Sequence, residues 1–295
     1  MSSSSQLSWL RAMPFVFVVI WSTGFIVARF GMPNSPPFAF LWLRFAFSIL
    51  CFLPWVYLAK VPWPNDKRQW LHLAVTGIFI QAGYLGGVWS AVKGGMGSGL
   101  SALIVGLQPV LTAMWLSSQG GHVTRRQWQG LLLGFVGLSM VVSHKLEDGI
   151  EVTPFSLGMA FMALASITVG TLYQKKFVKP CDVRTASSVQ LMAAWVITLP
   201  LAMMETEAIQ WNHQILYVMA WSVLCLTLGG SSLFYILIQR GAAASVTSLM
   251  YLVPPTTAVL ALLLFGETMT FVTLLGILVT ALGVSLVVRP PKING

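Results

Sequence analysis

The chain has 295 residues, of which 56% are hydrophobic and only 8% are charged, and its formal net charge is +9. Soluble domains carry roughly 25% charged residues, so this composition excludes a soluble globular protein and indicates a membrane protein. The basic residues are dispersed over short loops, which disfavours a nucleic-acid partner and leaves the lipid bilayer as the expected surroundings.

Ten apolar stretches follow one another along the chain, each near the ~20 residues that a helix needs to cross the hydrocarbon. These stretches are 13–30, 38–59, 71–92, 97–117, 128–143, 155–174, 185–204, 215–238, 243–265 and 271–288. The first lacks a small-residue cleavage site and is followed by nine more, so we expect a retained helix rather than a signal peptide. We therefore predict an all-α membrane protein with ten transmembrane helices.

The sequence repeats itself at an offset of 146 residues, because segment 130–142 recurs as segment 276–288. Further pairs keep nearly the same offset: Gly24 with Gly170, Arg44 with Gln190, Pro54 with Pro200, and Pro109 with Pro254. We expect two five-helix repeats, covering residues 13–143 and 155–288, with a central cavity between them.

Corresponding loops of the two repeats carry opposite charge. Lys67 and Arg68 follow the second stretch, whereas Glu205 and Glu207 follow the seventh. Lysine and arginine are retained in the cytoplasm during insertion, so the matching loops should lie on opposite sides and the repeats should be inverted. With both termini cytoplasmic, 13 lysines and arginines lie inside, three lie outside, and Arg44 lies within a span.

Motifs of soluble enzymes are absent from the sequence. It contains no HExxH, Walker or GxSxG pattern, and its four histidines are far apart and close to the predicted interfaces. We expect no catalytic residue, metal or cofactor. The glycine-rich segment 94–99 joins two spans without a preceding strand, which favours a tight turn over a nucleotide site.

Prolines interrupt the fourth and ninth stretches near their middles, at Pro109 and at Pro254 and Pro255. Each removes a backbone donor and frees a carbonyl within the bilayer. Interruptions at corresponding positions of inverted repeats point to a midplane binding site in transporters, so we expect hinges here. The alternative is that they are kinks tolerated by a membrane helix.

Polar and aromatic side chains recur at helical spacing on the stretches near these prolines. The predicted substrate-binding residues are Trp21, Gln81, Tyr84, Ser101, Gln108, Ser166, Tyr235 and Tyr251. The alternative for the hydroxyl and amide groups is hydrogen bonding between helices. Small residues four apart, such as Gly83 with Gly87 and Ser166 with Gly170, indicate close helix packing.

Arg44 lies well inside the second stretch, and no acidic residue lies within any stretch to pair with it. A charge at this depth is costly, so it should either snorkel or bond to backbone carbonyls, or else meet the carboxylate of a substrate. The lack of an acidic residue in the spans also disfavours a carboxylate proton relay or sodium site.

Tryptophans support the predicted depths. Eight of the 12 fall at predicted span ends, where an indole prefers the headgroup region. They are Trp9, Trp55, Trp63, Trp70, Trp89, Trp115, Trp128 and Trp211.

These motifs resemble those of the EamA family of drug/metabolite transporters. The resemblance covers roughly residues 14–288 and rests on four segments: 20–25 followed by Arg29, 43–45, 264–267, and the Gly-x6-Gly-x-Ser-x-Val-Val pattern that ends both repeats. The overall character is similar to YddG-type aromatic amino acid exporters. In this family an acidic residue usually follows the glycine that precedes the last helix of each repeat, as in Gly266-Glu267. The first repeat has His122 after Gly121 instead, so a role of the family's glutamate carries over only to Glu267.

The resemblance implies an exporter in a bacterial inner membrane that works by alternating access. Its expected substrates are amino acids, aromatic ones first, and related metabolites or cationic drugs. A small-molecule substrate and the bilayer are its expected partners, and a monomer is its expected state. Tyrosines and Trp21 could stack on an aromatic or cationic solute. A channel-like protein, or one that translocates lipids or nucleotide sugars, is the alternative.

Overall fold

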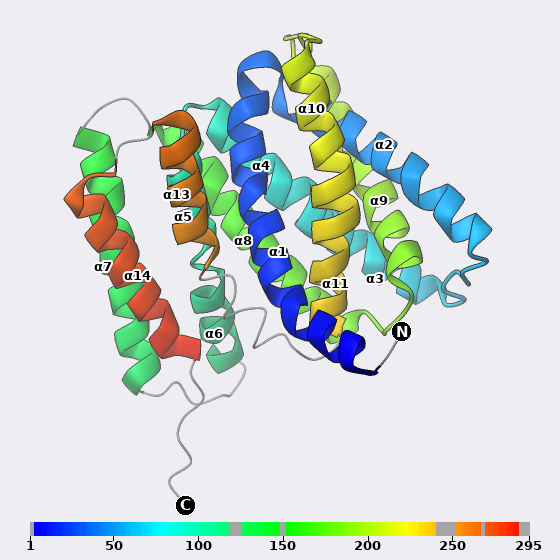
Figure 1. The fold of residues 1–295 in the computed structure, drawn as a ribbon, viewed down its shortest axis with the longest axis horizontal. Coiled ribbons are helices and arrows are strands. Elements are labelled where there is room, and N and C mark those ends of the chain that lie inside the picture. The colour runs from blue at the N-terminus through cyan, green and yellow to red at the C-terminus, as the bar shows by residue number, and fades with distance from the viewer. Residues whose placement is uncertain (1–2, 119–124, 148–151, 240–251, 267–268, 289–295) are drawn as a thin grey trace, which may run out of the picture.

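The computed structural model describes residues 3–118, 125–147, 152–239, 252–266 and 269–288. Within these residues the regular structure is entirely helical, which confirms the predicted all-α class (Figure 1). Long apolar helices stand side by side in one bundle, as a membrane protein requires, because only structures that satisfy their own backbone hydrogen bonds can span the hydrocarbon.

The helices of the first half cover the predicted stretches, although α1 begins ten residues before the predicted start at residue 13 and the fourth stretch is divided between α5 and α6. In chain order they are α1 (Ser3–Gly31), the 3-10 turn η1 (Met32–Asn34), α2 (Pro37–Leu58), α3 (Lys67–Gly77), η2 (Ile78–Gly83), α4 (Tyr84–Lys93), α5 (Ser98–Val105), α6 (Gln108–Ser118) and α7 (Arg125–Glu147). The second half contains α8 (Pro154–Phe177), α9 (Val183–Met204), α10 (His213–Trp221), η3 (Ser222–Ser231), α11 (Ser232–Gln239), α13 (Val253–Phe265) and α14 (Phe271–Val288).

Within the described part of the chain, six helical stretches are long and apolar enough to cross a membrane by length and composition. They are Phe15–Asn34, Pro37–Leu58, Lys67–Lys93, Pro154–Phe177, Val183–Met204 and His213–Gln239. Shorter apolar helices follow each group of three, at Ser98–Thr112, Trp128–Gly137, Val253–Phe265 and Phe271–Gly283. Three long stretches followed by two shorter ones therefore occur twice, as a two-repeat chain requires.

Polar caps fix where several helices begin. The Asp66 carboxylate accepts the backbone N–H of Arg68 at the start of α3, and Asn212 accepts that of Ile215 at the start of α10. These side chains satisfy N–H groups that have no partner within the helix. Asp66 and Asn212 are 146 residues apart, so the same device starts the third helical stretch of each half.

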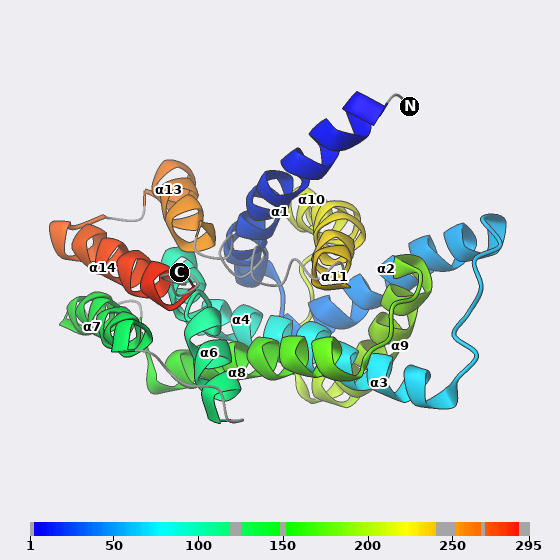
Figure 2. The same cartoon turned by 90° about the horizontal axis from the view of Figure 1, so that it is seen from below.

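Corresponding helices of the two halves pack in pairs at opposite ends of the bundle. α2 lies along α9 and α7 lies along α14, as Figure 2 shows from below. Glycine permits the second contact, because a Cβ atom at Gly137 would lie 2.6 Å from the carbonyl oxygen of Gly276. Close packing at the small residues of η2 and α8 is likewise confirmed, since a Cβ atom at Gly83 would lie 2.7 Å from Ser166 Oγ.

Both halves carry a π-helix within the third of their long stretches. Residues 78–83 form η2 between α3 and α4, and residues 222–231 form η3 between α10 and α11. With the offset of 146, the first range maps onto 224–229. Such segments are rare and occur frequently at functional sites, so a matched pair marks this level of the bundle.

The fourth stretch is broken, not bent. α5 ends at Val105, α6 begins at Gln108, and Pro109 occupies the first turn of α6, where the missing N–H costs no helical hydrogen bond. Pro254 lies likewise in the first turn of α13. The alternative of a kink within one continuous helix therefore does not describe Pro109, and a hinge at these prolines stays a prediction.

Candidate functional site

A cavity lies at the level of the two π-helices, between helices of both halves. It is lined by Trp21, Gly24, Phe25, Arg44, Ile80, Gln81, Tyr84, Leu85, Val88, Trp89, Leu226 and Ser231. We call it the central cavity. α1, α2, η2 and α4 supply most of the wall, and η3 closes it from the second half. Of the predicted site residues, the structure brings together Trp21, Gln81, Tyr84 and Arg44.

Arg44 supplies the only cationic side chain in this lining, and it is 2% exposed. Its Nε donates to Thr227 Oγ1 at 3.1 Å, and the Thr227 hydroxyl donates in turn to the Ser222 carbonyl at 2.9 Å. This second bond reaches five residues back, which is the π-helical spacing. The π-helix η3 therefore holds a hydroxyl where it orients the guanidinium.

The remaining hydrogen-bonding capacity of Arg44 is incompletely used. Its Nη1 is buried and has no hydrogen-bond partner among the described residues, and none of the ion pairs found there involves Arg44. The guanidinium carbon lies 5.9 Å from the ring centroid of Trp89, within the range of a cation–π contact. A buried guanidinium with an unused donor beside a cavity is suited to an anionic group.

Aromatic rings form a further part of the cavity wall. The rings of Trp21 and Tyr84 stack with centroids 5.9 Å apart and an interplanar angle of 3°. Phe17 and Phe234 pack behind Trp21, with centroids 5.1 and 5.0 Å from its ring. These contacts hold the indole in one orientation, so the wall is built before any solute arrives.

The central cavity is narrow in this conformation. Its volume is about 30 Å³. Pockets for small-molecule ligands are typically about 300–1,000 Å³, so a solute fits only when the walls separate.

Three predicted residues lie outside this lining. Ser101 is completely buried in α5, and its hydroxyl has no partner among the described residues. Gln108 Nε2 donates to Thr171 Oγ1 of α8 at 3.0 Å. Ser166 packs against Gly83 at the contact of α8 with η2. The contacts of Gln108 and Ser166 are therefore those expected from the alternative interpretation, in which these side chains serve packing between helices.

The two remaining predicted tyrosines are separate from the cavity or outside the described part of the chain. Tyr235 lies in α11, where its hydroxyl is 3.1 Å from Cys181 Sγ, and it packs with Leu73 and Val189 in another cluster. Tyr251 lies outside the described residues.

Trp89 belongs to this lining, although its position near a predicted span end indicated the headgroup region. Trp89 is 1% exposed, lines the central cavity and stacks on Phe40 with centroids 4.6 Å apart. Trp55 and Trp211, placed at span ends by the same reasoning, are 48% and 54% exposed. The sequence nevertheless contains one indication that Trp89 is buried. It comes shortly after the Gly86-Gly87 pair, at which α4 packs closely against its neighbours.

A protein-family model matches the chain twice. The EamA-like transporter family model aligns with residues 9–143 and again with residues 155–289. The chain belongs to the EamA-like transporter family. Its two copies of one family unit account for the matched helix pairs and π-helices described above.

Curated relatives of this EamA-like protein are named as transporters. It is 24% identical over 284 residues to the uncharacterized inner membrane transporter YedA of Escherichia coli K12, covering 96% of this chain and 91% of that protein. It is 25% identical over 271 residues to a probable amino-acid metabolite efflux pump of Salmonella typhimurium, covering 88% of each. A solved crystal structure with 17% identity has a TM-score of 0.68 over 93% of this chain and 95% of the other, which supports the fold alone.

Proposed function

We propose that this membrane transporter exports amino acids, aromatic ones first, and related metabolites by alternating access through the central cavity. The observation that carries the proposal is the buried Arg44 with an unused donor beside the cavity. An amino acid offers this guanidinium a carboxylate. The name of the Salmonella typhimurium relative points to the same class of solute.

The remaining wall suits the other parts of an amino acid. The Gln81 side chain and the Ser231 hydroxyl line the cavity and can bond an ammonium group. The rings of Trp21 and Tyr84 offer faces to an aromatic side chain once they separate. Because the cavity is contracted, we infer that binding is coupled to a movement of α1 relative to α4, the helices that carry these rings.

Counterflow in proteoliposomes tests the proposal. Vesicles loaded with L-phenylalanine should accumulate labelled L-phenylalanine transiently, because a carrier exchanges solute across the membrane and a channel does not. Arg44→Gln should raise the half-saturating concentration about tenfold or more, since a charge-assisted hydrogen bond is lost. Phenethylamine, which lacks the carboxylate, should compete equally with both proteins. Absence of counterflow for every amino acid tested would refute the proposal.

We further propose ten transmembrane helices in two inverted repeats, with both termini in the cytoplasm of the bacterial cell. The asymmetric distribution of lysine and arginine supports this orientation. The start of α1 and the end of α14 lie toward the same end of the bundle in Figure 1, as an even number of crossings requires. Single cysteines at Ser4 and Asn294 should react with an impermeant reagent only after permeabilisation, and reaction in intact cells would contradict the topology.

A further inference from the structure

A second and larger cavity lies at the end of the bundle where α2 begins and α4 and α9 end. Its volume is about 430 Å³, within the range typical of ligand pockets. It is lined by Pro36, Pro37, Phe38, Ser90, Lys93, Phe155, Leu201, Met204, Glu205, Thr206 and Glu207. We call it the Lys93 cavity. It shares no lining residue with the central cavity.

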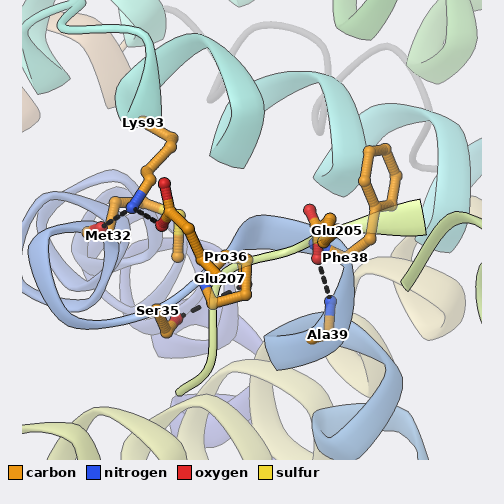
Figure 3. Close-up of polar contacts among 8 residues, drawn as sticks. All are labelled: Met32, Ser35, Pro36, Phe38, Ala39, Lys93, Glu205 and Glu207. Atoms are coloured by element: carbon orange, nitrogen blue, oxygen red, sulfur yellow. Dashed lines mark hydrogen bonds and ion pairs between the residues drawn. The ribbon is translucent and has the colours of Figure 1, made fainter. Parts of the chain in front are cut away.

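The three charged side chains of this cavity are engaged unequally. The Glu205 carboxylate accepts the backbone N–H groups of Phe38 and Ala39 at 2.9 and 2.7 Å, in the first turn of α2 (Figure 3). Lys93 Nζ donates to the Met32 carbonyl at 3.1 Å and pairs with Glu207 at 2.5 Å. Both oxygens of Glu205 thus cap the start of α2, whereas Lys93 and Glu207 can each bind a ligand group in place of the other.

This ion pair is partly exposed. The side chains of Lys93 and Glu207 are 29% and 60% exposed. Exposed pairs contribute only about 0–1 kcal/mol, so a ligand can separate them at little cost if both charges find new partners. A ligand with a single charge would leave either the lysine or the glutamate unpaired. A zwitterion satisfies both.

Ser90 adds a polar group that the protein itself does not use. Ser90 is 3% exposed and lines the Lys93 cavity. Its buried Oγ has no hydrogen-bond partner among the described residues. Buried hydroxyls are nearly always hydrogen-bonded. The Ser90 hydroxyl, one helical turn from Lys93, therefore keeps hydrogen-bonding capacity that a ligand group could use.

We propose that the Lys93 cavity is a second binding site, specific for zwitterionic amino acids. The ligand carboxylate replaces Glu207 on Lys93 Nζ, the ligand ammonium binds the Glu207 carboxylate, and Ser90 bonds one of the two groups. The apolar side chains of Phe38, Phe155 and Leu201 form the wall for the amino-acid side chain. This site is additional to the central cavity and does not require that transport passes through the latter.

Occupancy of the site would also loosen this end of the bundle. The Lys93–Glu207 pair joins the end of α4 in the first half to the 205–212 connection of the second half. A zwitterion that takes both partners removes this link and leaves the Glu205 cap on α2 in place. A solute at this end would therefore favour separation of the halves.

Protection of an introduced cysteine tests the site with a defined ligand. Thr206 is exposed and lines the cavity, so Thr206→Cys should react with a charged methanethiosulfonate in reconstituted vesicles, with the parent protein as background. L-phenylalanine at about ten times its dissociation constant should slow the reaction about tenfold, because only the free protein reacts. Phenethylamine and 3-phenylpropionate, each with one charge, should protect far less. Equal protection by either would overturn the proposal.

Variants assign the protection to the proposed residues. In the Thr206→Cys background, Lys93→Gln and Glu207→Gln should each raise the protecting concentration about tenfold or more. Glu207 is mainly exposed, so its variant tests the site even if Lys93→Gln misfolds. Lys176→Gln, a distant charge control on α8, should retain the protection, and so should Arg44→Gln, which separates this site from the central cavity. Unchanged protection in Glu207→Gln would refute the assignment.

A lipid headgroup offers similar chemistry, because phosphatidylethanolamine carries an ammonium and an anionic group. The labelling is therefore performed in phosphatidylglycerol vesicles with and without added phosphatidylethanolamine. Protection by L-phenylalanine in the absence of ethanolamine lipid supports an amino-acid site. Protection of Thr206→Cys by the ethanolamine lipid alone would identify the occupant as lipid and overturn the proposal.

Discussion

The ring of Pro254 lies against Gly106, so closely that a Cβ atom on the glycine would be 2.6 Å from the proline Cγ. Gly106 lies in the break between α5 and α6, and Pro254 lies in the first turn of α13. The interruptions that the sequence shows in both halves therefore meet in space, and the contact exists because one partner has no side chain.

Substituting Gly106 with alanine should destabilise the protein. The proline ring is rigid, so the added methyl group forces the backbones apart at a cost of about 1–3 kcal/mol, as for other overpacked cores. The melting temperature of the purified protein should fall, and transport should fall with it.

Gly158→Ala provides the matched control for this substitution. Gly158 lies within α8, where an added Cβ atom meets no atom within 4 Å, so alanine should be neutral or slightly stabilising. Equal melting temperatures for Gly106→Ala and Gly158→Ala would show that the contact with Pro254 adjusts freely.

Replacing Pro109 or Pro254 with alanine should reduce transport and leave the folded yield close to normal. Both prolines lie in the first turn of a helix, so alanine fits there without strain. It restores a backbone donor and permits helix to extend across the preceding residues, which would stiffen a junction that we propose to act as a hinge. Transport rates in vesicles with equal amounts of protein measure the effect, and parental rates in both variants would show that the prolines serve packing only.

The helices and the candidate site differ in how far the sequence reveals them. Hydropathy predicts most helix limits to within a few residues, because a span needs a long apolar run whatever surrounds it. The depth of Arg44 and Trp21 followed from the same pattern. That both residues line one cavity could only be hypothesised from the sequence, because the cavity depends on how α1, α2 and α4 pack.

Packing details were the features that the sequence could not reveal. Nothing in the residue types of 78–83 or 222–231 distinguishes π-helix from α-helix, and contacts such as that of Thr227 with Arg44 are visible only in the folded chain. Trp89 has the composition and position of an interfacial residue and is nevertheless buried against Phe40. The proline in the fourth stretch indicated an interruption, but not that this interruption lies against Pro254 of the other half.

Acid should destabilise the start of α9 through Asp182. Arg184 donates side-chain bonds to this carboxylate at 2.9 and 2.8 Å, and these bonds lower the pKa of Asp182. A carboxyl whose pKa is lower in the folded state stabilises the protein above its unfolded value of about 3.9, and this contribution is lost as the pH falls through the folded pKa.

The corresponding measurement is the melting temperature of Asp182→Asn between pH 7 and pH 3. The variant should be less stable than the parent at pH 7 by about 1 kcal/mol, because asparagine still caps the helix but loses the charge pair. The difference should shrink toward pH 3. Asp66→Asn, which alters a cap without such an arginine fork, should show a smaller difference. A difference for Asp182→Asn that does not change with pH would contradict the assignment.

Trp21→Ala and Tyr84→Ala should lower the transport of L-phenylalanine and L-tryptophan more than that of L-threonine. The two rings stack in the central cavity, and each presents a face to an aromatic solute when the pair opens. Loss of one desolvated ring contact should weaken binding by about 0.5–2 kcal/mol, which is a few-fold to some thirty-fold in affinity.

Trp42→Ala is the matched control, because Trp42 stacks on Trp195 with centroids 5.5 Å apart and lies outside the cavity lining. It removes an indole pair of similar geometry and should reduce stability without changing the ratio of aromatic to aliphatic transport. An equal loss for all three solutes in Trp21→Ala would mean that this ring only holds α1 against α4, and the aromatic preference would then have to arise elsewhere.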